Sequence, residues 1–421
     1  MKTSGWISSV RKMKNWAFAD LQTGTAPKPL SVLLGPAHTP GLSTGACVEI
    51  TGTLQPKPNQ QETELNASSV KLLGSCPAEY PLQKKYHTPE YIRQFPQFRW
   101  RTRSGAQVLR YRSWAIRRIS DYFDSIDTFQ VNSPIITSSD CEGAGEVFAL
   151  KNAQEFFGKP AYMTVSSQLH LEVYCQALAR VWNLSPAFRA EASDTNRHLS
   201  EFWMVEAEFA FVDMPQTLEI LRGMVQSAIP TGTMAEDIVA SKRTPELREK
   251  IQARWNLLKG PWNTITYTDA VKILQAAFDQ KKVVTPIKWG EGLPSEHEKY
   301  LSGTHFGTPV FVTDYPTSIK PFYMKKSSED TVACFDLLIP EIGELAGGSM
   351  REDSYDQLIS NIAAQGSDPS HMQWYTDLRK FGSFPHGGYG VGFERMIMYV
   401  CGLDNIRDAT GFIRGFNALQ C

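Results

Sequence analysis

Arginine and glutamate side chains stand close together in two short runs of this sequence, FRAEASDTNRHLSEF at residues 188–202 and GGYGVGFERM at residues 387–396. Arg189 and Glu191 are two residues apart in a predicted strand, so their side chains lie on the same face. Arg395 begins a predicted helix after a glycine-rich strand. Guanidinium groups bind phosphate oxygens with paired hydrogen bonds, and a nearby acceptor suits an adenine amino group. ATP is the ligand that fits this set of groups.

Neither run is specific by itself. FRAE is four residues of a strand, and an ordinary surface ion pair explains most such pairings. The alternating glycines of GGYGVG suggest a dinucleotide-binding loop, but their spacing differs from that fingerprint. Too few residues follow for a βαβ unit with an acidic ribose ligand. The order and number of runs along the chain favour the ATP interpretation.

Composition limits the classes of protein that fit. The 421-residue chain is 42% hydrophobic, which is enough for a large core and two or three domains. It has no run of about 18 apolar residues, which argues against a membrane span. Its seven cysteines form no CxxC pair, which predicts reduced thiols and no zinc site. The basic N-terminal run lacks the apolar segment of a secretory signal.

The net charge of -1 gives no overall attraction for nucleic acid, so affinity for RNA must come from local patches. One such patch interleaves basic and aromatic residues between positions 84 and 118. Solvated helix faces are the common alternative explanation for such charges. The basic residues are Lys84, Lys85, Arg93, Arg99, Arg101, Arg103, Arg110, Arg112, Arg117 and Arg118.

The pattern of elements changes along the chain. Five short β-rich runs separated by turn residues fill positions 5–74, which predicts a small barrel of the oligonucleotide-binding (OB) type. A polar, aromatic connector follows. Helical periodicity begins near residue 111, before the predicted strand FQVNSPIIT at 129–137, and strands and helices then alternate. Residues from about 213 to 263 have a helical pattern with loops.

Three further runs carry a family resemblance: TSSDCEGAGEVF at 137–148, TVSSQLHLEV at 164–173 and PEIGELAGGSMRED at 340–353. With the first two runs, they resemble class II aminoacyl-tRNA synthetases of the aspartate/asparagine branch, and the bacterial and mitochondrial asparaginyl type most closely. The resemblance implies an α+β fold with a five-stranded OB-fold barrel at 1–78 and a connector at 79–105. A class II catalytic domain with an antiparallel sheet and flanking helices would fill 106–421, with a helical insertion at about 213–263.

The resemblance also assigns the ATP residues. Arg189 would bind the α-phosphate, Glu191 the adenine amino group and Phe202 the adenine face. Arg395 would hold the far end of a bent triphosphate. The other expected residues are Arg197 and His198 near the outer phosphates or the tRNA acceptor end, and Asp336 and Glu344 as magnesium ligands, since hard oxygen ligands suit Mg²⁺.

The same resemblance also assigns the residues of the amino-acid site. Glu142 would lie near the substrate ammonium in a flexible loop, and Gln168 would contact its backbone. Aspartate-specific members have a lysine where this chain has Leu171. The next residue, Glu172, would accept from the carboxamide and repel a carboxylate, although a pairing with an arginine in the fold is the alternative. Arg351 would hold the side-chain carbonyl, so the predicted substrate is asparagine.

The predicted reaction needs no covalent nucleophile. The asparagine carboxylate would attack the α-phosphorus of ATP, pyrophosphate would leave, and the acyl group would pass to the terminal ribose of tRNA(Asn). Three other functions would leave different marks in the sequence. An aspartyl-tRNA synthetase should carry lysine in place of Leu171. A non-catalytic RNA-binding paralogue should have lost Arg189, Arg395 or Glu344, and an ammonia-dependent asparagine synthetase lacks the barrel.

Partners and location follow from the resemblance. Pro134, in the predicted strand FQVNSPIIT, matches the proline at the family's dimer interface, which predicts a homodimer. Phe18 is expected to stack on an anticodon base with Arg11, Lys12 and Lys14 near phosphates, unless Phe18 belongs to the barrel core. The location expected from the resemblance is the mitochondrial matrix, and the alternative is the cytoplasm. The run at 405–421 departs from the family's usual proline-rich ending, and the chain begins close to its first predicted strand.

Overall fold

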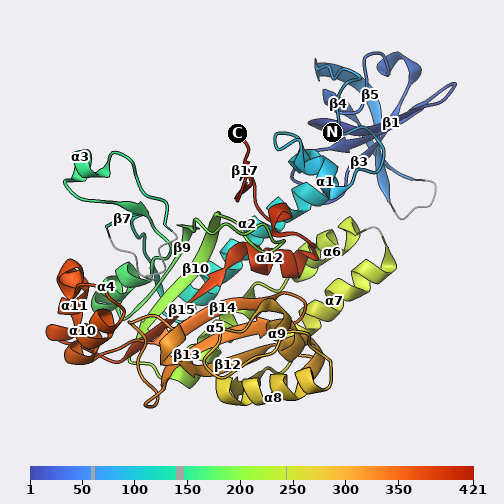
Figure 1. The fold of residues 1–421 in the computed structure, drawn as a ribbon. Coiled ribbons are helices and arrows are strands. Elements are labelled where there is room, and N and C mark those ends of the chain that lie inside the picture. Colours follow the sequence, from blue (N-terminus) through green and yellow to red (C-terminus); the bar gives the residue numbers. More distant parts are fainter. Residues whose placement is uncertain (58–61, 139–146, 243) are drawn as a thin grey trace. The chain divides into compact units, whose positions relative to one another are not determined.

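The computed structural model describes residues 1–57, 62–138, 147–242 and 244–421. The chain forms two compact units (Figure 1). The first contains Met1–Arg110 and Gly232–Arg243, and the second contains Tyr111–Thr231 and Thr244–Cys421. Among the described residues, none of the helices combines the length and apolar character needed to cross a bilayer.

A closed five-stranded barrel forms most of the first unit, with strand order β1-β2-β3-β5-β4. Its β3 and β5 pair in parallel and its other strand pairs are antiparallel. Alternate residues such as Ile7, Ala19 and Leu21 point inward and are almost fully buried, as the two-residue period of a strand requires. The predicted five-stranded barrel is therefore confirmed. The strands are β1 (Lys2–Lys12), β2 (Ala17–Gln22), β3 (Leu30–Leu34), β4 (Cys47–Pro56) and β5 (Thr63–Gly74).

The segment after the barrel packs within the first unit. Arg101 donates from Nη2 to the carbonyl of Gly45 at 2.8 Å. Arg110 forms two hydrogen bonds, of 2.7 and 3.0 Å, to the buried carboxylate of Asp237. These contacts attach the connector and α6 to the barrel unit. The elements are η1 (Pro36–His38), α1 (Pro89–Arg93), η2 (Arg99–Arg101), the start of α2 (Arg103–Asp124), and α6 (Gly232–Ser241).

An eight-stranded sheet forms the centre of the second unit, in the order β11-β12-β13-β14-β15-β10-β9-β6. The six inner strands are antiparallel, as predicted, and the edge strands β11 and β6 pair in parallel with their neighbours. In chain order the strands are β6 (Phe129–Gln130), β9 (Arg180–Phe188), β10 (Glu201–Ala210), β11 (Asn263–Thr266), β12 (Val310–Pro316), β13 (Thr331–Ile339), β14 (Gly343–Met350) and β15 (His386–Gly392).

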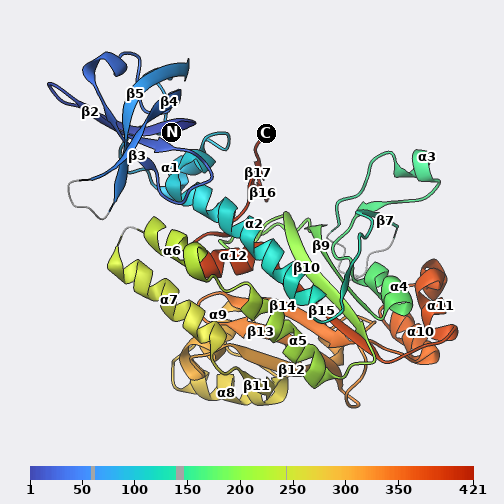
Figure 2. The ribbon, with the colours of Figure 1, turned by 180° about the vertical axis from the view of Figure 1, so that it is seen from behind.

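Helices cover this sheet. Figure 1 shows α4, α10 and α11 gathered at one end, while Figure 2 shows α5 on the opposite face, where it packs against β15. The helices are α3 (Ala153–Phe157), α4 (Gln168–Leu178), α5 (Met214–Ser227), α7 (Pro245–Lys259), α8 (Tyr267–Asp279), α9 (Ser295–Lys299), α10 (Tyr355–Ala364), α11 (Gln373–Lys380) and α12 (Phe393–Cys401). The shorter elements are β7 (Ile136–Thr137), β8 (Tyr162–Met163), η3 (Tyr300–His305), η4 (Thr317–Ile319), η5 (Pro369–Met372), η6 (Ile406–Asp408), β16 (Arg414–Gly415) and β17 (Ala418–Leu419).

One expected strand differs. The run FQVNSPIIT is divided into β6 and β7, and Pro134 lies exposed in the extended segment between them. Proline has no backbone N–H to donate to a ladder, which explains why pairing stops before it.

The glycine-rich strand β15 makes room for a side chain of β10. Gly388 stands opposite Glu208 in the register of the two strands. A Cβ atom at position 388 would lie 2.1 Å from Oε2 of Glu208 and 2.2 Å from the carbonyl oxygen of Ala207. Any larger residue at 388 would therefore displace Glu208. The glycines of GGYGVG serve close strand packing here, which agrees with the rejection of a dinucleotide loop.

Candidate active site

A cavity of about 410 Å³ opens in the second unit and is lined mainly by β10, β14, β15 and the loop after β9. Ten of the residues predicted from the sequence line it together. They are Gln168, Arg189, Glu191, Arg197, His198, Phe202, Asp336, Glu344, Arg351 and Arg395.

One end of the cavity carries the aromatic ring and guanidinium expected for a nucleotide. Arg189 follows the last residue of β9, and its backbone N–H donates to the carbonyl of Ser200 at 2.9 Å. Its guanidinium carbon lies 5.6 Å from the centroid of the Phe202 ring on the paired strand β10. Glu191 lies in the following loop, where Oε2 is 3.9 Å from Nε2 of His198. This geometry offers a ring face, an acceptor and a cation in one place.

Arg395 lies in the first turn of α12 and reaches across to β14. Its Nη1 donates to the carbonyl oxygen of Glu344 at 3.0 Å and to Oε2 of the same residue at 3.2 Å. Burial opposes ionisation of Glu344, but the positive charges of Arg395, Lys320 and Arg189 outweigh burial and lower its pKa. Glu344 is therefore held as a carboxylate.

Arg197 is held by a residue that the sequence reasoning did not identify. Its Nη1 lies 2.6 Å from Oε2 of Glu298, on α9. The same carboxylate accepts the backbone N–H of Glu344 at 3.2 Å. Burial, followed by the nearby negative charge of Glu344, raises the pKa of Glu298. Neither acid of SEHEK gave a signal in the sequence, because the partners of Glu298 come from distant parts of the chain.

The two carboxylates expected to bind magnesium share one space. A Cβ atom on Gly347 would lie 3.3 Å from Oδ1 of Asp336 and 3.6 Å from Oε1 of Glu344. Lys320, which the sequence reasoning missed, has Nζ 3.1 and 3.2 Å from the two oxygens of Asp336. Burial raises the pKa of Asp336, and Lys320 only partly offsets this. Two hard oxygen donors facing one space fit a divalent cation.

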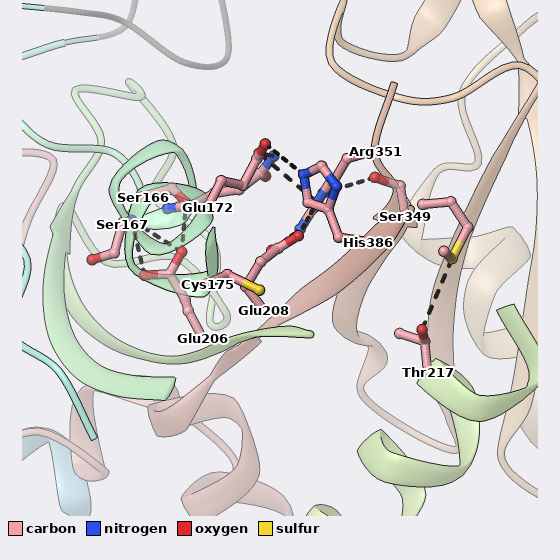
Figure 3. A network of polar contacts seen from close by, with 12 residues as sticks. Ser166, Ser167, Glu172, Cys175, Glu206, Glu208, Thr217, Ser349, Arg351 and His386 are labelled. Carbon is pink, nitrogen blue, oxygen red and sulfur yellow. Dashed lines mark hydrogen bonds and ion pairs between the residues drawn. The ribbon is translucent and has the colours of Figure 1, made fainter. Parts of the chain in front are cut away.

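Arg351 lies at the end of β14 and faces the floor of the cavity. Its Nε and Nη2 donate to the two oxygens of Glu208, each at 2.9 Å, and Nη1 donates to Oγ of Ser349 at 2.7 Å (Figure 3). Among the described residues these bonds use three of its five N–H groups, and one N–H on each terminal nitrogen has no acceptor. Arg351, which lines the cavity, therefore keeps two N–H donors for a ligand.

Two acids of β10 also line the cavity and were missed from the sequence. Glu206 and Glu208 alternate with Ala207, so both point to the same face. Glu206 accepts from Oγ of Ser166 at 2.5 Å and from the backbone N–H of Ser167 at 3.0 and 3.1 Å. Burial raises the pKa of both carboxyl groups despite these bonds and the Arg351 pair. The signal was present: two acids at alternate positions in the apolar strand MVEAEFA.

Comparison with known proteins agrees with this geometry. Residues 89–414 match the model of tRNA synthetases class II (D, K and N), and residues 2–73 match the OB-fold nucleic acid binding domain. An asparagine–tRNA ligase, mitochondrial, from Saccharomyces cerevisiae is 43% identical over 98% of this chain and 91% of its own length. The chain belongs to the asparagine–tRNA ligase family. The resemblance predicted from the sequence motifs is thus confirmed.

Other asparagine–tRNA ligases are similar over nearly their full length. One from Microcystis aeruginosa is 38% identical over 97% of this chain and 94% of its own. The crystal structure of asparaginyl-tRNA synthetase from Pyrococcus horikoshii complexed with asparaginyl-adenylate superposes with a TM-score of 0.88 at 28% identity. That match covers 100% of this chain and 96% of the other.

Glu172 was expected to contact the substrate carboxamide, but in the structure it lies behind the cavity wall and pairs with other side chains. It is 1% exposed and is absent from the cavity lining, whereas its neighbours Gln168 and Leu171 line the cavity. Its carboxylate accepts from Gln168 at 3.1 Å, one helical turn earlier, and from three side chains of α11 and β15. Those three are Tyr375 at 2.9 Å, Arg379 at 2.5 Å and His386 at 3.0 Å.

The remaining predicted residues lie elsewhere. Glu142 is outside the described residues. On the barrel of the first unit, Phe18 is 43% exposed, so it is not a core residue. Arg11 stands directly opposite Phe18 in the pairing of β1 with β2, and Lys12 and Lys14 follow, exposed, in the same turn region. An exposed aromatic ring and three basic side chains therefore lie together where β1 turns into β2.

Proposed function

We propose that this chain activates L-asparagine with ATP, forming asparaginyl-adenylate and pyrophosphate, and then transfers asparagine to the 3′ end of tRNA(Asn). The observation that carries the proposal is one cavity with two kinds of recognition. Arg189, Phe202 and Arg395 suit a nucleotide at one end, while the Arg351–Glu208 pair suits a small polar side chain at the other.

In the first step the protein aligns reactants and stabilises charge. Arg189 contacts the α-phosphate, where charge increases as the asparagine carboxylate attacks. Arg395 and Arg197 hold the outer phosphates, with His198 beside them. Glu191 accepts from the adenine amino group, and Phe202 stacks on its ring. No side chain forms a covalent intermediate, because the substrate carboxylate is itself the nucleophile.

Asp336 and Glu344 would hold Mg²⁺, which when bound neutralises phosphate charge and orients the triphosphate. The shared space above Gly347 supports this pair. Lys320 lies beside Asp336 and keeps positive charge there. The carboxylate of Glu344 also pairs with Arg395. Glu344 therefore connects the proposed metal site to the arginine that is proposed to bind phosphate.

The end of the cavity near Arg351 binds the uncharged carboxamide of the substrate asparagine. The two N–H groups of Arg351 that point away from Glu208 and Ser349 donate to its carbonyl oxygen. Glu206 and Glu208, facing the same cavity, accept hydrogen bonds from N–H groups of the substrate. Gln168 contacts the amino-acid backbone. Glu142, which is outside the described residues, is proposed to contact the ammonium group.

tRNA binding is proposed to involve the barrel. Phe18 stacks on an anticodon base, and Arg11, Lys12 and Lys14 contact phosphates. The exposed ring of Phe18 opposite Arg11 supports this role.

We further propose a homodimer that buries the surface around Pro134. The apolar side chains of Phe129, Ile135 and Ile136 are 55%, 38% and 45% exposed, which supports an interface there. Light scattering during gel filtration tests this directly. A dimer that Ile136→Glu converts to monomer is the expected result, and a monomeric unaltered protein would contradict the proposal.

The mitochondrial matrix is the proposed location, supported by the mitochondrial names of the relatives from Saccharomyces cerevisiae and Schizosaccharomyces pombe. Cell fractionation with a matrix marker checks this. Recovery of the protein outside the protease-protected matrix fraction would rule the location out.

Pyrophosphate exchange with ATP, Mg²⁺ and either asparagine or aspartate tests the function, because it separates activation from tRNA binding. Exchange with asparagine alone is expected. Aminoacylation of tRNA(Asn) then tests the second step. Preference for aspartate would overturn the substrate assignment, and absence of exchange by the folded protein would indicate a non-catalytic relative.

A further inference from the structure

Glu298 on α9 stands behind the cavity, where three segments of the chain meet. It is 7% exposed and is not among the residues that line the cavity. Its Oε2 accepts from Nη1 of Arg197 at 2.6 Å and from the backbone N–H of Glu344 at 3.2 Å. Arg197 comes from the loop between β9 and β10, and Glu344 from the start of β14. One carboxylate oxygen therefore joins two residues that do line the cavity.

The first residue of β14 leaves space for this oxygen. Gly343 has a φ of +86°, a conformation that favours glycine. A Cβ atom at position 343 would lie 2.4 Å from Oε2 of Glu298 and 3.1 Å from Nη1 of Arg197. The same Nη1 lies 3.4 Å from the carbonyl oxygen of Ile342. The backbone of residues 342 and 343 is therefore shaped around the pair of Glu298 and Arg197.

Neighbouring contacts hold α9 in place. Glu296 accepts the backbone N–H of Thr285 at 3.1 Å, and Nε2 of His297 lies 2.8 Å from the carbonyl oxygen of Thr285. The carbonyl of Glu298 accepts from Oγ of Ser302 at 2.8 Å. Because the chain is anchored on both sides of Glu298, its carboxylate has a fixed position.

The pairing with Glu298 leaves Arg197 able to bind a ligand. In the described part of the chain, only Nη1 of its guanidinium donates to protein acceptors, so the N–H groups of Nε and Nη2 remain for a ligand in the cavity. A guanidinium held at one nitrogen loses less conformational freedom when its other N–H groups bind phosphate oxygens.

We propose that Glu298 is a positioning residue for the outer phosphates of ATP: it fixes Arg197 against the start of β14, so that the guanidinium is in place before the nucleotide binds. The inference rests on the proposed contact of Arg197 with these phosphates. Without Glu298, the nucleotide would have to order the arginine itself, and this ordering reduces the net free energy of binding.

Glu298→Gln tests this by removing the negative charge while keeping the size of the side chain. The KM for ATP in pyrophosphate exchange should rise about tenfold, and the KM for asparagine should change by less than about twofold. Calorimetry with a non-hydrolysable ATP analogue should show the same loss of affinity without turnover. The affinity for AMP, which lacks the outer phosphates, should be unchanged, whereas a general distortion of the cavity would weaken both ligands.

Glu296→Gln is the matched control. Glu296 lies on the same helix, but its carboxylate accepts the backbone N–H groups of Val284 and Thr285. This variant should keep the original affinity for the ATP analogue.

Arg197→Ala separates positioning from a purely structural role. Alone, it should weaken binding of the ATP analogue about tenfold or more. Adding Glu298→Gln should then change the affinity by less than about twofold, because the side chain that Glu298 positions is gone. If Glu298→Gln does not fold, Glu298→Asp provides the second test. It keeps the charge but shortens the side chain, so it should weaken the ATP analogue about threefold or more and leave AMP binding unchanged.

Equal losses for the ATP analogue and AMP would overturn the inference and leave Glu298 a structural role only. An effect of Glu298→Gln that is the same with and without Arg197 would do so too. Full affinity in Arg197→Ala would remove the phosphate contact on which the inference rests, and the inference with it. Failure of the proposed function looks different, because the unaltered protein itself would then show no exchange with asparagine.

Discussion

The guanidinium of Arg351 and the carboxylate of Glu208 form two parallel hydrogen bonds, each 2.9 Å long, between the end of β14 and the strand β10. Arg351→Met leaves Glu208 buried without its partner. The free energy of unfolding should fall by about 3 to 5 kcal/mol, and kcat/KM for asparagine by about 100-fold or more. Urea unfolding and pyrophosphate exchange measure the two effects. Arg351→Met with Glu208→Leu should recover part of the stability without recovering activity, and recovery of activity would contradict the assignment.

The exposed ring of Phe18 gives a prediction for the barrel. Phe18→Ala should reduce kcat/KM for tRNA(Asn) about 10- to 100-fold, because stacking on one base contributes about 1 to 3 kcal/mol. Pyrophosphate exchange without tRNA should be unchanged. Leu54→Ala, which removes another exposed apolar side chain of the barrel, is the control. Equal effects of the two variants would show that Phe18 makes no specific contact.

Glu394 on α12 connects α2 to the active-site strand β10. Its buried carboxylate lies 2.6 Å from Nη1 of Arg112 and accepts the backbone N–H of Trp203 at 2.8 Å. Glu394→Gln should lower the free energy of unfolding by about 2 to 3 kcal/mol. Glu219→Gln, which breaks an exposed pair with Arg222, should cost less than about 0.5 kcal/mol in urea unfolding. A negligible effect at Glu394 would mean that the pair contributes nothing.

The lowered pKa of His198 leads to a predicted dependence of protein stability on pH. Burial and the positive charge of Arg395 lower the pKa of His198 below its ordinary value of 6.5. As the pH falls below about 6.5, the unfolded chain therefore takes up more protons than the folded protein, and stability decreases. His198→Asn should show a shallower decrease between pH 7.5 and 5.5 in urea unfolding. The exposed His371→Asn should keep the original slope. Identical slopes for both variants would contradict the predicted shift.

The sequence predicted the parts of the site that occupy a fixed place in a motif. Arg189, Phe202, Glu344 and Arg395 each belong to a run with a recognisable order, and all four line the cavity. The barrel was predictable for a different reason, since five short β-rich runs separated by turn residues stand out in the sequence, and the structure buries alternate residues such as Ala19 and Leu21.

Residues whose role depends on a distant partner were not predictable in the same way. Glu298 and Lys320 gave no clear signal, because surface acids and lysines are common. Glu298 became identifiable through Arg197, which is 101 residues away. The strand around Pro134 was misjudged, because FQVNSPIIT was predicted as one strand whereas a proline without an N–H interrupts it.

The amino-acid sequence by itself determined the family, the chemistry of the ATP-binding groups and the preference for asparagine, because these depend on residue type and order along the chain. Only the tertiary structure decided where Glu172 acts. Its partners Tyr375, Arg379 and His386 are 203, 207 and 214 residues away, and they turn its carboxylate into a fixed, buried counter-ion behind Arg351. Burial and charge pairing are properties of neighbours in space, and one residue's type does not specify them.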